Sequence, residues 1–102
     1  MVAVVAENRR IAEWCARSGV PCLSDFNALR SATESTEIDY LFSITNLKML
    51  PDWLLAQPRR MAINFHDGPL PRYAGLNAPV WALIHGEPEH GITWHQMETG
   101  AD

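Results

Sequence analysis

Short apolar segments alternate with helical repeats from one end of this chain to the other, and this alternation limits the fold more than any other feature. Short apolar or β-branched runs predict strands at residues 1–6, 20–23, 39–44, 61–65 and 92–97. Helical spacing and helix-start residues predict helices at residues 9–18, 26–32, 51–56 and 79–84. Because helices separate the strands at short intervals, we expect an α/β fold: a partial doubly wound, Rossmann-like parallel sheet with flanking helices.

Residues that favour helix ends mark several of these boundaries. Asn8 can accept hydrogen bonds from the first turn of a helix, and Gly19 stands where a left-handed C-cap residue is favoured. Ser24 is the expected N-cap of the second helix, and Pro51 begins the third. Gly86 ends the fourth. The helix limits are therefore predicted from local chemistry as well as from periodicity.

Functional sites of doubly wound sheets lie past the carboxyl ends of the strands. Three segments lie at or past the carboxyl ends of predicted strands: 43–50, 64–75 and 98–102. We expect all three to converge on one crevice. Residues 66–75 contain two prolines and two glycines, which exclude a regular helix or ladder, so they are predicted to form an ordered loop.

A carboxamide and an imidazole stand two positions apart at the end of a predicted strand. Asn64 and His66 should leave the strand on the same side, while Phe65 points to the other side. The Asn64 N–H₂ could donate to a developing oxyanion while the imidazole of His66 handles protons, which suits acyl transfer. The pattern is short and common, so the spacing alone does not establish a site.

Two longer motifs are more specific. Residues 63–75 read Ile-Asn-Phe-His-Asp-Gly-Pro-Leu-Pro-Arg-Tyr-Ala-Gly, and residues 90–102 read His-Gly-Ile-Thr-Trp-His-Gln-Met-Glu-Thr-Gly-Ala-Asp. Together they resemble the signature loop and the H-G-x-T strand of the folate-dependent formyltransferase family. This resemblance implies that residues 1–102 form an incomplete N-terminal catalytic domain, without the first strand and helix and without the C-terminal part. If so, the chain alone would be unstable or would associate with itself.

The resemblance also implies a role for each matching residue. Asn64 would stabilise the tetrahedral intermediate, His66 would accept a proton or stabilise the oxyanion, and Asp102 would orient His66 and relay a proton through water. Asp67, next to His66, is an alternative partner for the imidazole.

The donor in this family is 10-formyltetrahydrofolate, and the resemblance implies that its pterin lies against two segments of this chain. The expected contacts are Leu47, Lys48, Met49, Leu50, Met97, Glu98 and Gly100.

The resemblance implies that the acceptor is an amine, but it does not identify the molecule that bears this amine. Asp67 and Gly68 follow the imidazole, where purine and tRNA formyltransferases usually have Pro or Ala-Ser, and residues 66–79 look most similar to formylation domains of nonribosomal peptide synthetases. The expected acceptor is therefore an aminoacyl starter unit on a carrier protein domain. The alternatives are an amino sugar, methionyl-tRNA, or a catalytically inactive folate-binding remnant.

Composition excludes other classes of protein. The formal charge of −4 does not fit a nucleic-acid-binding surface. His85, His90 and His95 lack a common zinc spacing, so no metal is expected, and His95 is expected to be a hydrogen-bonded strand residue that lines the site.

The remaining features point to an ordinary cytoplasmic protein. No apolar run is long enough for a membrane span, and Cys15 and Cys22 are expected to be buried thiols of a cytoplasmic protein. Trp81 and Trp94 are expected in the core, and the alternative for Trp94 is a substrate wall formed together with Tyr73.

Overall fold

The computed structural model describes residues 1–46 and 48–98. The chain divides into two compact units, Met1–Ile38 and Asp39–Asp102, each of which is described by itself.

The first unit is a β-α-β-α segment built on one pair of short parallel strands. Its elements are β1 (Val4–Val5), α1 (Arg9–Ser18), β2 (Cys22–Leu23) and α2 (Phe26–Thr33). Val4 pairs with Cys22 and Val5 with Leu23, both in parallel register. The parallel pair with a helix between its strands is the repeating unit of the predicted fold.

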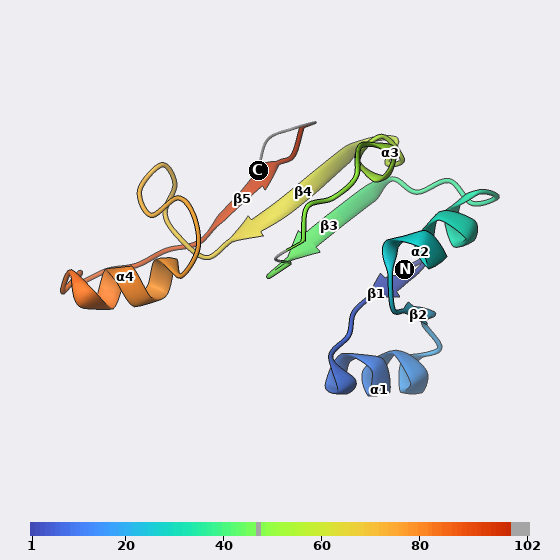
Figure 1. The fold of residues 1–102 in the computed structure, drawn as a ribbon, viewed down its shortest axis with the longest axis horizontal. Helices are drawn as coiled ribbons and strands as arrows, with labels where there is room; N and C mark the ends of the chain where they lie inside the picture. The colour runs from blue at the N-terminus through green and yellow to red at the C-terminus, as the bar shows by residue number, and fades with distance from the viewer. Residues whose placement is uncertain (47, 99–102) are drawn as a thin grey trace. The chain divides into compact units, whose positions relative to one another are not determined.

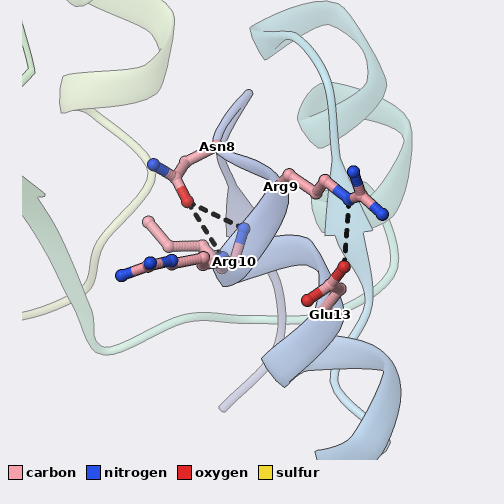
Figure 2. Close-up of polar contacts among 5 residues, drawn as sticks. Asn8, Arg9, Arg10 and Glu13 are labelled. Atoms are coloured by element: carbon pink, nitrogen blue, oxygen red, sulfur yellow. Dashed lines mark hydrogen bonds and ion pairs between the residues drawn. The ribbon is translucent and has the colours of Figure 1, made fainter.

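Helix α1 begins and ends where its capping residues predict. The Asn8 Oδ1 atom accepts hydrogen bonds from the backbone nitrogens of Arg10 at 2.9 Å and Ile11 at 3.2 Å, as Figure 2 shows. Gly19 has φ 70°, the left-handed conformation of a glycine C-cap. In the same view the Arg9 guanidinium contacts the Glu13 carboxylate one turn later.

Helix α2 has a different N-cap from the expected one. The Asp25 Oδ1 atom accepts from the Ala28 backbone nitrogen at 2.8 Å, so Asp25 and not Ser24 caps this helix. Serine and aspartate have nearly equal N-cap preferences, and here they are neighbours.

The two thiols of this unit differ in burial. Cys15 is 1% exposed, whereas Cys22 is only partly buried, and both are free. Burial, followed by a hydrogen bond and charge interaction with Cys22, raises the pKa of the Cys15 thiol. The expectation of a buried thiol is confirmed for Cys15 and holds only partly for Cys22.

The second unit contains a three-stranded sheet in the order β3-β4-β5. Its elements are β3 (Tyr40–Ile44), α3 (Asp52–Leu55), β4 (Met61–His66), α4 (Ala78–Ile84) and β5 (Thr93–Gln96). Strands β3 and β4 run parallel, from the pair Tyr40 and Met61 to the pair Ile44 and Phe65. Helix α4 lies beyond the carboxyl end of β4 (Figure 1). The α/β class predicted from the sequence is confirmed.

Strand β5 departs from a purely parallel sheet because it pairs with β4 in the antiparallel sense. The chain leaves the carboxyl end of β4, forms α4 near that end and re-enters the sheet there, so the next strand runs back (Figure 1). His66 pairs with Thr93 at the start of β5, and the Met97 backbone nitrogen donates to the Ala62 oxygen at 2.9 Å. Met97 therefore leaves the sheet at the end of β4 opposite to His66, and residues 99–102 of the segment expected to converge on the site lie outside the described residues.

The two faces of this sheet are covered differently. Ser43 and Ala62 are buried on one face, at 7% and 4% exposure. Tyr40, Phe42 and Trp94 lie on the other, where the Phe42 and Trp94 ring centroids are 6.4 Å apart and each ring is about half exposed. Trp94 is 50% exposed, and so the prediction that it belongs to the core is wrong.

Trp81 of α4 is also 51% exposed, against the same prediction. In both cases aromatic character was the only basis for the expectation, and it does not say what covers a side chain.

Candidate active site

Asn64 and His66 lie on one face at the carboxyl end of β4, as their two-residue spacing predicts. Their cross-strand partners on β5 are His95 and Thr93. Because paired residues of neighbouring strands share a face, an amide, two imidazoles and a hydroxyl are gathered there. Trp94 pairs with Phe65 and points to the opposite face, which removes it from this site.

The Asn64 amide is oriented by His95. The distance between Asn64 Nδ2 and His95 Nε2 is 3.2 Å, and His95 Nδ1 lies 3.3 Å from the Gln96 carbonyl oxygen. A carbonyl oxygen can only accept, so Nδ1 of a neutral His95 carries the proton and Nε2 accepts from Asn64. His95 is thus a hydrogen-bonded residue of the strand beside the site, as expected, and the second N–H of Asn64 has no acceptor among the residues that the structure describes.

The His66 imidazole is held by the backbone of the following loop. Its Nε2 atom lies 2.7 Å from the carbonyl oxygen of Tyr73, which again requires a proton on Nε2. Within the described residues, His66 forms no hydrogen bond with the Asp67 carboxylate, the alternative partner considered from the sequence. Nδ1 of His66 has no hydrogen-bond partner among residues 1–46 and 48–98, so it is the ring nitrogen available to a reacting group in this part of the chain.

The two sequence motifs are joined by hydrogen bonds that fix the loop after β4. His90 Nε2 donates to the Asp67 carbonyl oxygen at 2.6 Å, and Thr93 Oγ1 donates to the Gly68 oxygen at 2.7 Å. The same hydroxyl accepts from the Leu70 backbone nitrogen at 3.1 Å. The histidine and threonine of the H-G-x-T segment therefore act as anchors for the loop that follows His66.

The turn after β3 reaches the same edge of the sheet with a simpler structure. Asn46 Nδ2 donates to the Lys48 oxygen at 2.7 Å, and Asn46 Oδ1 accepts from the Lys48 nitrogen at 3.1 Å. Met49 is 75% exposed, and Leu50 is partly buried. Lys48, Met49 and Leu50 follow the carboxyl end of β3, which lies beside that of β4.

The other expected site residues divide into two groups. Leu47, Gly100 and Asp102 lie outside the described residues. Met97 and Glu98 follow β5 and leave the sheet beside Ala62, the opposite end from His66. The structure therefore places Asn64 and His66 on one face of β4, the 48–50 turn after the neighbouring strand β3, and Met97 at the other end of β4.

Sequence reasoning missed a polar cluster around Tyr73. The Tyr73 hydroxyl donates to Glu87 Oε1 at 2.8 Å and lies 3.2 Å from His85 Nδ1. Arg72 forms an ion pair with the same Glu87 carboxylate, and its guanidinium carbon lies 5.4 Å from the Tyr73 ring centroid. The Arg-Tyr pair of the first motif was visible in the sequence, but its partners depend on the path of α4.

These contacts set the charges of the cluster. Burial, followed by the hydrogen bond and charge of Glu87, raises the pKa of Tyr73. The Tyr73 hydrogen bond is the largest cause of the lowered pKa of Glu87, with Arg72 adding to it and burial opposing it. Glu87 is therefore a carboxylate and Tyr73 a neutral donor at neutral pH.

A hollow beside α4 does not include the amide and imidazole of β4. It has a volume of about 280 Å³ and is lined by residues that include Pro79, Leu83 and His90, but by neither Asn64 nor His66. Within residues 1–46 and 48–98 no group of three or more His, Cys, Asp or Glu could hold a metal ion. The helices of this part of the chain are all too short or too polar to cross a bilayer.

The fold and the site define a class: an α/β protein whose sheet edge presents an amide donor beside an imidazole, an arrangement suited to acyl transfer. The family model described as formyl transferase matches residues 21–102. The chain belongs to this family.

Curated relatives support the assignment. The methionyl-tRNA formyltransferase of Geobacter metallireducens is 49% identical over 55 residues, which cover 54% of this chain and 18% of the relative. That of Synechococcus elongatus is 38% identical over 72 residues, or 71% of this chain and 22% of the relative. The chain thus spans about a fifth of the length of these two relatives.

Solved structures show the same Rossmann-like fold. The phosphoribosylglycinamide formyltransferase of Anaplasma phagocytophilum superposes with a TM-score of 0.80 at 22% identity, covering 100% of this chain and 53% of the other. Glycinamide ribonucleotide transformylase 1 of Geobacillus kaustophilus gives a TM-score of 0.79 at 23% identity, covering 99% and 61%.

Proposed function

We propose that the full-length protein transfers a formyl group from 10-formyltetrahydrofolate to an amine. The observation that carries the proposal is the pairing of Asn64 and His66 on one face at the end of β4, in a chain of the formyl transferase family. A hydrogen bond with His95 orients the Asn64 amide, and a hydrogen bond with the Tyr73 carbonyl orients the His66 imidazole.

In the proposed reaction the acceptor nitrogen attacks the formyl carbon and forms a new C–N bond. The formyl oxygen gains negative charge in the tetrahedral intermediate, and the second N–H of Asn64 donates to it. The bond from the formyl carbon to N10 of the folate then breaks. A proton passes from the attacking amine to N10, and Nδ1 of His66 is the ring nitrogen that can accept and return it.

Asp102 is proposed as the group that orients His66 and relays this proton through water. Replacing Asp102 by Asn keeps its shape and removes its charge, so the rate should fall while donor affinity changes little. Single-turnover transfer and donor binding, measured on the full-length protein, separate these effects. Equal rates for the two forms would remove Asp102 from the mechanism.

For the donor we propose contacts with Leu47, Lys48, Met49 and Leu50. The described part of this turn follows β3, whose carboxyl end lies beside that of β4. Met97 and Glu98 are weaker candidates, because β5 ends at the opposite end of the sheet. Gly100 remains proposed on the resemblance alone.

We propose an aminoacyl group as the acceptor, with a carrier protein domain as its carrier. Asp67 and Gly68 after the imidazole, and an acidic chain with formal charge −4, favour a carrier other than RNA. The second candidate acceptor is methionyl-tRNA, because two similar proteins are named methionyl-tRNA formyltransferase.

The test incubates the full-length protein with 10-formyltetrahydrofolate and one acceptor at a time. The acceptors are an aminoacyl carrier domain, methionyl-tRNA and a nucleotide-linked amino sugar, and mass spectrometry detects the added formyl group. Formylation of the carrier domain is the expected result. Formylation of the tRNA or the sugar instead would overturn the acceptor. Donor binding without transfer to any of them would favour an inactive folate-binding protein.

A further inference from the structure

Tyr73 holds His66 through its backbone in a conformation that a tyrosine seldom adopts. Its φ is 57°, in the left-handed region that is rare for bulky residues. The carbonyl oxygen of this residue lies 2.7 Å from Nε2 of His66. A residue in this conformation persists only where contacts with the surrounding structure stabilise it.

The side chain of Tyr73 is held from several directions by the segment that follows α4. Its hydroxyl donates to Glu87 at 2.8 Å, and its ring centroid lies 5.9 Å from those of both His85 and His90. Arg72 joins the same Glu87 carboxylate. The ring and hydroxyl of Tyr73 are thus fixed by groups that come 12 to 17 residues later in the chain.

The contact between His66 and Tyr73 is also enclosed sterically. A Cβ atom placed on Gly68 would lie 3.0 Å from His66 Nε2, 3.0 Å from the Tyr73 oxygen and 3.1 Å from the Ala78 Cβ. Two of these three neighbours are backbone or packed side-chain atoms that cannot easily move. Because Gly68 has no side chain, it leaves space for the hydrogen bond between His66 and the Tyr73 carbonyl.

We propose that Tyr73 and Glu87 are positioning residues for His66: the Glu87 carboxylate fixes the Tyr73 hydroxyl, and the Tyr73 carbonyl then fixes the Nε2–H tautomer of the imidazole. The expected effect on the rate rests on the proposed function, because it assumes that His66 takes part in formyl transfer. The contacts that hold His66 do not depend on that function. Neither Tyr73 nor Glu87 is assigned a contact with substrate.

The first readout is spectroscopic and does not depend on activity. In the full-length protein labelled with ¹⁵N-histidine, long-range ¹H–¹⁵N correlation reports which ring nitrogen carries the proton, and a His66→Gln variant assigns the signal. Wild type should show the Nε2–H tautomer for His66. Tyr73→Phe and Glu87→Gln should each shift this signal toward a mixture of tautomers.

The second readout is kinetic. Tyr73→Phe should lower kcat for formyl transfer on the order of tenfold and leave the donor KM within about twofold, because a misplaced catalytic group affects the reaction more than binding. Glu87→Gln should act in the same direction with a smaller effect. Gly68→Ala should give the largest loss, on the order of 10². Tyr40→Phe is the matched control, because Tyr40 is the other of the two tyrosines of the chain and lies on the face of the sheet opposite to His66.

The outcomes separate the inference from the proposed function. An unchanged His66 signal in a folded Tyr73→Phe or Glu87→Gln variant overturns the positioning role, whatever the activity. A shifted signal in a protein that transfers no formyl group supports the positioning role and overturns the proposed function. If Tyr73→Phe does not fold, the His66 signal of Glu87→Gln alone supports or overturns the positioning role.

Discussion

Two segments leave the sheet at the same edge and are held in different ways. The loop after β4 is joined to β5 and to the segment after α4 through Thr93, His90 and Glu87. In the turn after β3, Asn46 forms two hydrogen bonds with Lys48, two residues away. Long-range hydrogen bonds thus anchor the loop that follows His66, and hydrogen bonds between near neighbours contribute to the turn proposed to meet the donor.

This difference suits the two proposed tasks. A group that acts on a transition state must be held within a fraction of an ångström, whereas a wall that binds a flexible ligand can adjust. We therefore expect substitutions of the anchors to affect stability and rate, and substitutions in the 45–50 turn to affect donor binding.

Removing the anchor at Thr93 should have the largest effect on stability. Thr93→Val keeps the shape but leaves the Gly68 oxygen and the Leu70 nitrogen without their partner, so the free energy of unfolding should fall by about 1 to 3 kcal/mol. Asn46→Ala should cost about 0.5 kcal/mol or less, because its turn is exposed. Urea unfolding of the full-length protein measures both. Thr93→Ser is the control that keeps the hydroxyl, and equal losses for Thr93→Val and Asn46→Ala would contradict the comparison.

A smaller effect is expected in the turn after β3. Met49 is 75% exposed, so Met49→Ala should leave stability unchanged but raise the donor KM about fivefold, the equivalent of about 1 kcal/mol of lost contact. Steady-state kinetics at varied donor concentration tests this. Leu83→Ala on α4 removes a similarly exposed apolar side chain, at 81%, and serves as the control. An unchanged KM for Met49→Ala would remove this residue from the donor site.

The smallest expected effect is the pH dependence of the Tyr73 cluster. Because the Tyr73 hydrogen bond lowers the pKa of Glu87 in the folded protein, its stabilising contribution is present above the usual value of 4.5 and is lost as the pH falls through the lowered pKa. The urea midpoints of wild type and Glu87→Gln should therefore differ at pH 7, and the difference should shrink as the pH falls below 4.5. A difference that stays constant over this range would show that the carboxylate charge does not matter.

The sequence predicted those parts of the molecule that depend on near neighbours. Asn8 and Gly19 defined α1 correctly because capping is a contact within a few residues. The shared face of Asn64 and His66 follows in the same way from the alternation of a strand. Ser24 was the wrong cap because Asp25, its neighbour, satisfies the same rule.

The rest could not be predicted because it depends on where distant segments return. The residue pattern of β5 is the same whichever way the strand runs, so its direction, and with it the end at which Met97 leaves the sheet, was open. The exposure of Trp81 and Trp94 depends on what covers α4 and the sheet. The contact of Tyr73 with Glu87 requires the path of the chain through α4, which no local rule supplies.

The central claim is that Asn64 and His66 perform formyl transfer, and Asn64→Ala tests it most directly. In the full-length protein, single-turnover transfer of a labelled formyl group and donor affinity are measured separately for wild type and variant. Loss of one oxyanion donor predicts a rate lower by about 10² to 10³ with donor affinity within about twofold. An Asn64→Ala protein that transfers the formyl group at nearly the wild-type rate would contradict the account.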